Sequence, residues 1–361
     1  MRITFLCPVL TQNGGNRVIA IYAEKLVALG HDVTVIARKP AEPDTRSLRG
    51  IYRLLRHGRK RVSPNRMVFF RNLGDRVIEL EPDQHITPDL VPDGDVVIAT
   101  WWRTAFDVVG LPPQKGAKAY FVQHHEVHDH QPKALAGGSY HLPLKKIAVA
   151  GWLAREMGET YGDHDTVVVP NAVDTDYFDA PARARNTPPR VGLMYAATPF
   201  KGVDISLKAI EIARRDHPDL DVVAFGRGEP QADLPLPPRT TYHRDPAQSD
   251  IPGIYAACDA WMVGSRSEGF GLPILEAMAC RTPVVATQTG AAPDLIETGR
   301  NGMVVPLEDP DAMGRALSDL LSQSPDDWRA MSDAAYATAR SWSWDDAAQA
   351  FEAALIGIAG R

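Results

Sequence analysis

Two glutamates separated by seven residues flank a glycine-rich segment in the second half of the chain. The segment reads Ser267-Glu268-Gly269-Phe270-Gly271-Leu272-Pro273-Ile274-Leu275-Glu276-Ala277. Pro273 suits the first turn of a helix, so the glycines are expected at the carboxyl edge of a sheet, where ligands bind. Backbone N–H groups there can donate to sugar or phosphate oxygens, and Glu276, expected in the first helical turn, offers two acceptors to a cis-diol such as ribose. The alternative is a helix entry with a favourable first-turn carboxylate.

Apolar runs and helical patterns alternate along the chain and predict two doubly wound α/β domains. Its 361 residues exceed what one core usually fills. A β-α-β pattern covers 2–37, and a similar alternation restarts at Val191 after a stretch rich in Pro, Ala and Arg. We expect Rossmann-like domains at 1–178 and 191–342, a linker at 179–190, and a C-terminal helix at 343–361 that packs back on the N-terminal domain.

Composition excludes several classes of protein. The net charge of -6 and the pI of about 6.0 argue against binding of nucleic acid by the whole chain. The three cysteines lack metal-ligand spacing, which indicates a reduced, cytoplasmic protein. The N-terminal run 2–10 is typical of a strand rather than a signal peptide, and no apolar stretch approaches the ~20 residues of a membrane span.

The glutamate pair and its surroundings resemble family 4 of the retaining GT-B glycosyltransferases. Gly-Phe-Gly-Leu-Pro lies between the glutamates, and Glu-Ala-Met-Ala begins with the second of them. The segments 170–178, 283–287, 290–294 and 301–305 also resemble family motifs, although Ala172 replaces a usual glycine. The resemblance implies a GT-B fold, two Rossmann-like domains facing a central cleft. It spans nearly the whole chain and is weakest from Ala41 to Val96.

The resemblance also implies roles for individual residues. Glu276 would hold the ribose of the donor, Glu268 the donor sugar, and Lys201 the diphosphate. His124, or His125 in second place, would be the active-site histidine that follows a strand of the first domain. The donor would lie along Gly14, Gly15, Gly269, Phe270, Gly271 and Leu272, and secondary site candidates are Asn171, Arg103, Arg227, His243 and Arg244.

One position departs from the family pattern. Family members usually carry an arginine five residues before the lysine, but this chain has Ala196 there. Arg103 and Arg227 are candidates for the missing charge, and the alternative is a site that works with less positive charge.

No metal or cofactor is expected. The His-rich segment 124–130 lacks the helical His-Glu-x-x-His spacing, and a His-rich surface loop is its alternative interpretation. Asp-x-Asp pairs, which hold a metal in other glycosyltransferases, occur five times and therefore do not discriminate. Gly14-Gly15 lacks the third glycine of a dinucleotide fingerprint, so a nicotinamide or flavin dehydrogenase is disfavoured.

A strongly basic segment extends from Arg46 to Arg71. It contains nine lysines and arginines and no acidic residue, with Ile51, Leu54 and Leu55 adding apolar character. Peripheral contact with an anionic membrane, contact with a phosphate-bearing acceptor, and a solvated loop are the three alternatives.

These observations favour a metal-independent enzyme that transfers a sugar from a nucleoside diphosphate to a carbohydrate, lipid-linked or small-molecule hydroxyl acceptor in bacterial polysaccharide, glycolipid or glycoconjugate synthesis. The alternatives are a sugar-nucleotide epimerase of the same architecture and a non-catalytic subunit that binds nucleotide sugars.

Overall fold

The computed structural model describes residues 1–41, 67–128 and 131–360. The chain divides into two compact units, the first made of 1–149, 153–169 and 348–361 and the second of 150–152 and 170–347. The division therefore falls after 169 rather than after 178, and it counts the expected linker 179–190 with the second unit.

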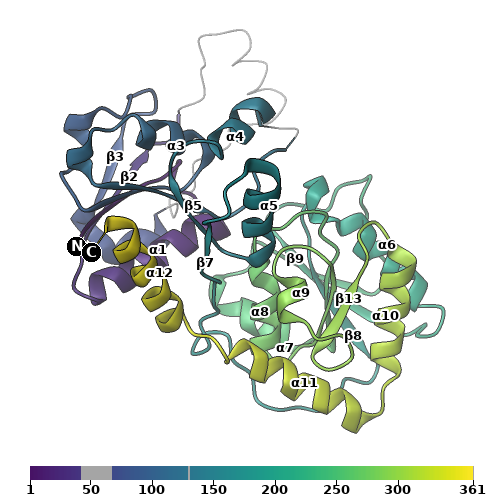
Figure 1. Ribbon diagram of the computed structural model, residues 1–361. Coiled ribbons are helices and arrows are strands. Elements are labelled where there is room, and N and C mark those ends of the chain that lie inside the picture. Colours follow the sequence, from purple (N-terminus) through teal and green to yellow (C-terminus); the bar gives the residue numbers. More distant parts are fainter. Residues whose placement is uncertain (42–66, 129–130, 361) are drawn as a thin grey trace. The chain divides into compact units, whose positions relative to one another are not determined.

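The first unit is built on a parallel sheet in the order β3-β2-β1-β4-β5-β6-β7 (Figure 1). Its central strands are apolar on both faces, as is typical of parallel strands covered by helices. The described strands are β1 (Arg2–Leu6), β2 (Asp32–Arg38), β3 (Val77–Leu80), β4 (Val96–Ala99), β5 (Ala117–Val122), β6 (Lys145–Ala148) and β7 (Val167–Val168). The helices are α1 (Gly14–Ala28), α3 (Trp102–Val109), α4 (Lys133–Ser139), α5 (Gly151–Tyr161) and most of α12 (Trp344–Ala359).

The C-terminal helix α12 packs on the first unit through one aromatic side chain. Phe351 is fully buried and stacks on Tyr22 of α1 with ring centroids 4.4 Å apart. It also contacts Phe5 of β1 and the edge of Phe121 of β5. The last residues of the chain therefore complete the core around its first strand.

The second unit is a parallel sheet in the order β10-β9-β8-β11-β12-β13. Helices α6 and α10 lie side by side along it (Figure 1). The described strands are β8 (Arg190–Met194), β9 (Asp221–Gly226), β10 (Thr240–Arg244), β11 (Ala260–Val263), β12 (Val284–Thr287) and β13 (Gly302–Val305). The helices are α6 (Val203–Ala213), α7 (Ile251–Ala256), α8 (Leu272–Ala279), α9 (Ala292–Leu295), α10 (Pro310–Ser322) and α11 (Pro325–Ala339). The predicted fold class, two doubly wound α/β domains, is confirmed.

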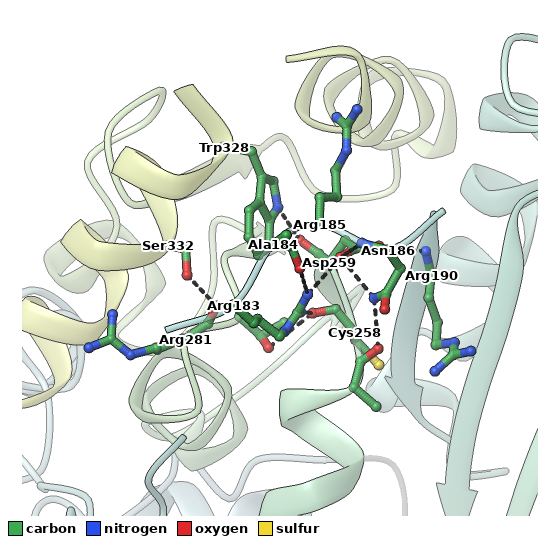
Figure 2. A network of polar contacts seen from close by, with 12 residues as sticks. Arg183, Ala184, Arg185, Asn186, Arg190, Cys258, Asp259, Arg281, Trp328 and Ser332 are labelled. Carbon is green, nitrogen blue, oxygen red and sulfur yellow. Dashed lines mark hydrogen bonds and ion pairs between the residues drawn. The ribbon is translucent and has the colours of Figure 1, made fainter. Parts of the chain in front are cut away.

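The segment 179–190 is held on the second unit by a buried carboxylate, shown in Figure 2. Asp259 is fully buried and accepts hydrogen bonds from the Arg183 guanidinium at 3.0 Å, from Asn186 N and Nδ2 at 3.0 and 2.9 Å, and from Arg190 N at 2.8 Å. The guanidinium also lies over the ring of Trp328. A buried charge is tolerated when its lone pairs are occupied in this way, so this segment is fixed to the surface of the unit.

Candidate active site

The candidate site of the second unit lies at the topological switch point of its parallel sheet, where the order in which strands are added changes side. Strand β8 leads outward to β9 and β10 on one side, whereas β11, β12 and β13 follow on the other side. Loops after β8 and β11 therefore leave adjacent strands at the same carboxyl edge. Ligands of open α/β sheets bind at such switch points.

Two glycines let these loops touch backbone to backbone. Gly202 has a φ of +56°, and a Cβ there would lie 1.8 Å from the carbonyl oxygen of Gly264. A Cβ on Gly264 would in turn lie 2.7 Å from the carbonyl oxygen of Gly202. Side chains at either position would push the loops apart.

The loops after β8 and β11 lie close enough for two of the predicted site residues to form an ion pair. Lys201 Nζ lies 2.7 Å from Glu268 Oε1, although the residues are 67 positions apart. The hydroxyl of Ser265 donates to the same oxygen at 2.8 Å. Glu268 is 8% exposed, and its charge is balanced by the ammonium group in a small cavity that Met194 and Pro273 also line. The pair is a charged, partly desolvated site at the switch point.

Glu276 lies just past the first turn of α8 rather than within it. Helix α8 begins at Leu272 after Gly271, whose φ is +95°, so Glu276 is the fifth helical residue and the first turn holds no acidic residue. The expected first-turn position was wrong by one residue, because the four residues from Leu272 to Leu275 complete the first turn before Glu276. The alternative of a first-turn carboxylate that stabilises the helix dipole is excluded for the same reason.

The carboxylate of Glu276 is buried and oriented by a tyrosine. Only 8% of Glu276 is exposed, and the hydroxyl of Tyr255 donates to its Oε2 at 2.9 Å. Tyr255 is itself fully buried, with its ring 4.4 Å from that of Trp261. A buried acid held in one orientation by a rigid aromatic donor suits recognition of a diol.

The glycine-rich loop between the two glutamates is fixed by the turn after β12. The carbonyl of Phe270 accepts a hydrogen bond from Ala291 N at 2.7 Å. Gly290 has a φ of +59°, and a Cβ there would lie 2.5 Å from the same carbonyl oxygen. The side chain of Phe270 is buried as well, so both its side chain and its carbonyl hold this loop in place. Gly269 and Gly271 flank this anchor.

In the first unit, Gly14 and Gly15 form the first turn of α1. Asn13 caps the helix, its side chain accepting from Asn16 N at 2.7 Å. The strand order of this parallel sheet changes side between β1 and β4, which makes this pair its switch point, and the two glycines follow β1. Arg103 lies in α3, after the other strand. A helix N-terminus at this position can bind an anion by donating hydrogen bonds from its backbone N–H groups.

The histidine candidates follow β5 and contact each other. His124 Nδ1 lies 2.9 Å from the carbonyl oxygen of His125 and 3.2 Å from His128 Nε2. His125 Nε2 is 2.7 Å from the hydroxyl of Tyr161, and burial lowers the pKa of His125. Residues 129–130 of this motif lie outside the described part. Over the described ranges, no three His, Cys, Asp or Glu side chains form a metal-binding group.

Glu126 is a partly buried acid that the sequence did not single out by itself. Its Oε2 accepts a hydrogen bond from Trp102 N at 2.9 Å, at the N-terminus of α3. Desolvation raises its pKa from 4.5 to about 8, against the opposing effect of the hydrogen bond from Trp102 N. Its place in the His-rich segment was visible in the sequence, but its contacts with Trp102 and Tyr140 depend on the tertiary structure.

Replacement of Glu126 by glutamine is expected to change how stability depends on pH. Between about pH 4.5 and about pH 8 the folded chain keeps a proton on Glu126 that the unfolded chain has lost, so wild-type stability falls as pH rises through this window. Glu126→Gln removes this decline and should be more stable than wild type at about pH 8 by on the order of a few kcal/mol, but not at about pH 4.5. Urea unfolding of both chains across this range measures the difference, and a difference independent of pH would contradict it.

The remaining candidates have different surroundings. Arg227 follows β9, which is the neighbour of β8, and β8 leads to Ala196, where the family carries its arginine. Arg103 belongs to the first unit. Arg244 is ion-paired with Glu229 and lies with His243 on the edge strand β10. Asn171 is 4% exposed. The basic segment from 46 to 66 lies outside the described residues.

Comparisons with known proteins agree with this architecture. HepE of Anabaena, solved in complex with UDP and glucose, has a TM-score of 0.73 and 17% sequence identity over 99% of this chain and 100% of that chain. Sucrose-phosphate synthase of Thermosynechococcus elongatus has a TM-score of 0.71 and 17% identity, covering 98% of both chains. The fold is therefore that of the GT-B class.

Family models cover most of the sequence. Residues 12–177 match the model described as Glycosyltransferase Family 4, and residues 189–323 match Glycosyl transferases group 1. The chain belongs to this glycosyltransferase family, which confirms the resemblance seen in its motifs.

One curated relative, the GDP-mannose-dependent alpha-(1-6)-phosphatidylinositol monomannoside mannosyltransferase of Mycolicibacterium smegmatis, is 32% identical over 177 residues, 43% of this chain and 46% of that protein. The chain spans about half or less of the length of the curated relatives it matches.

Proposed function

We propose that this chain transfers a sugar from a nucleoside diphosphate to a hydroxyl acceptor with retention of the anomeric configuration. The observation that carries the proposal is the Lys201–Glu268 ion pair at the switch point of the second sheet. It lies in the sequence context that the family uses for its donor sugar and diphosphate. The buried carboxylate of Glu276, eight residues further on, supports a ribose site.

The chemistry requires stabilisation of the departing diphosphate. The bond between the anomeric carbon and the diphosphate oxygen breaks, the acceptor oxygen bonds to that carbon from the same face, and the acceptor proton passes to the leaving group. Negative charge therefore grows near the diphosphate. The ammonium of Lys201 and fixed backbone N–H groups of the glycine-rich loop would stabilise it without a metal ion.

The substrates belong to the proposal as well. The Mycolicibacterium relative is named a GDP-mannose-dependent phosphatidylinositol monomannoside mannosyltransferase, and HepE was solved with UDP and glucose. A relative from Streptomyces scabiei, 32% identical over 55% of this chain and 51% of that protein, is named a D-inositol 3-phosphate glycosyltransferase. We propose a GDP- or UDP-sugar donor and a polyol or glycolipid acceptor in bacterial glycoconjugate synthesis.

Acceptor-dependent release of nucleoside diphosphate in excess EDTA is the expected result of an assay with these donors and acceptors. Product analysis by mass spectrometry shows whether a glycoside forms, and NMR of its anomeric proton shows retention. Release of nucleoside diphosphate without an acceptor, together with inverted configuration at one carbon of the sugar, would favour an epimerase. Activity lost on chelation and restored by magnesium or manganese would contradict metal independence.

Cytoplasmic location with peripheral contact to an anionic membrane is the remaining part of the proposal. It is supported by the nine basic residues between Arg46 and Arg71. None of the helices in the described ranges is long and apolar enough to cross a membrane. Running the same assay with vesicles of anionic lipid, and testing whether the chain sediments with them, separates membrane contact from a solvated loop.

A further inference from the structure

We propose that Arg266 is a positioning residue, which holds the loop carrying Lys201 against the loop carrying Glu268. This inference rests on the proposed function, because it assigns Arg266 to the same donor site. Arg266 lies two residues before Glu268, on the loop after β11. It was not among the residues singled out in the sequence.

Every N–H of the Arg266 guanidinium has an acceptor in the structure. Nη1 donates to the carbonyl of Pro199 at 2.7 Å and to Asp204 Oδ1 at 2.8 Å, and Nη2 donates to Asp204 Oδ2 at 2.8 Å. Nη2 also reaches Glu308 Oε2 at 3.2 Å, and Nε donates to Glu308 Oε1. These are the five donors that a guanidinium possesses.

The three acceptor residues come from two segments of the chain that are far apart in sequence. Pro199 and Asp204 bracket Lys201 on the segment after β8, whereas Glu308 lies between β13 and α10. The main chain adds to the connection, because Arg266 N donates to the carbonyl of Phe200 at 2.7 Å. Lys201 therefore lies between two groups, Phe200 and Asp204, that Arg266 fixes.

All five N–H groups of the Arg266 guanidinium are hydrogen-bonded within the cluster formed by Arg266, Pro199, Asp204 and Glu308. Its hydrogen bonds to the two carboxylates raise its pKa, and they lower the pKa of Asp204. No N–H remains to bind a diphosphate. Arg266 therefore does not replace the arginine that the family carries at the position of Ala196.

Exposure indicates that the cluster contributes little to stability. The side chains of Arg266, Asp204 and Glu308 are 29%, 41% and 59% exposed, and ion pairs at such exposure are screened by water. Bidentate geometry nevertheless restricts direction and distance, which a lysine with its single ammonium cannot reproduce. Loss of the guanidinium should consequently affect the placement of Lys201 more than folding.

The test compares Arg266→Lys with a matched control, Arg239→Lys. Arg239 also binds one carboxylate through two nitrogens, Nε and Nη2, which lie 2.9 and 2.8 Å from Asp221 Oδ1. It precedes β10 and contacts the first residue of β9, at the amino edge of the same sheet. Thermal unfolding and steady-state kinetics with varied donor and varied acceptor are measured for both variants.

Arg266→Lys should lower kcat by about tenfold to a hundredfold, because displacement of a charged group by about 1 Å has effects of this size. The acceptor KM and the unfolding midpoint should stay close to those of the wild type. Arg239→Lys should leave kcat unchanged. The double variant Arg266→Lys with Asp204→Asn should lower kcat by less than the product of the two single reductions, since both substitutions break the same contact.

Two results would overturn the proposal. One is wild-type kcat in Arg266→Lys, and the other is a loss of activity no greater than the loss of folded protein. Failure of the proposed function has a different signature, because the wild-type chain would then bind no nucleoside diphosphate and transfer no sugar.

Discussion

Lys201→Ala is expected to lower kcat by about a hundredfold to a thousandfold, the effect of removing one preorganised group from a developing negative charge. Two changes act together at this position. The ammonium that would face the diphosphate is lost. Among the described residues, the hydroxyl of Ser265 is then the one remaining side-chain donor to the largely buried carboxylate of Glu268. An unbalanced carboxylate would repel the leaving group just as its charge increases.

The conservative variant Lys201→Arg separates charge from geometry. It keeps the positive charge but replaces a compact ammonium by a planar fork, so partial activity is expected. Steady-state kinetics of both variants, with thermal unfolding to establish that they fold, provide the measurement. Turnover of Lys201→Ala within about threefold of wild type, less than ~1 kcal/mol in the barrier, would remove Lys201 from the reaction.

Glu276→Ala should weaken binding of the free nucleoside diphosphate by ten- to several-hundredfold. Hydrogen bonds to a charged carboxylate contribute ~1.5 to 3 kcal/mol, and Glu276 would make them to ribose in the ground state and transition state alike. The donor KM should therefore rise while kcat changes little. Isothermal calorimetry with the nucleotide measures this directly.

Two companion variants make the experiment specific. Tyr255→Phe keeps the buried ring but removes the donor to Glu276 Oε2, so a smaller loss of nucleotide affinity is expected. Glu268→Gln should instead lower kcat more than nucleotide affinity, because its partner is Lys201 and its proposed role is to position the sugar. Nucleotide binding by Glu276→Ala as tight as that of wild type would show that the ribose role is wrong.

Local sequence was sufficient for the type of most elements, and it named Lys201, Glu268 and Glu276 as candidates for the proposed donor site. Helix α1 could be predicted from the apolar periodicity before Gly30, and β1 and β2 from short apolar runs on either side of it. Such signals arise within a few neighbouring residues, because side-chain direction and capping depend on local backbone geometry. The motif around Glu268 and Glu276 is equally local.

Tertiary structure decided which of these residues meet and what surrounds them. Lys201 reaches Glu268 across 67 residues, and Arg266 reaches Asp204 across 62, because β8 and β11 are neighbours in the sheet. The burial that raises the pKa of Glu126 likewise arises from packing around it. Neither strand order nor burial is encoded in local periodicity, since both depend on how apolar faces from distant segments cover one another.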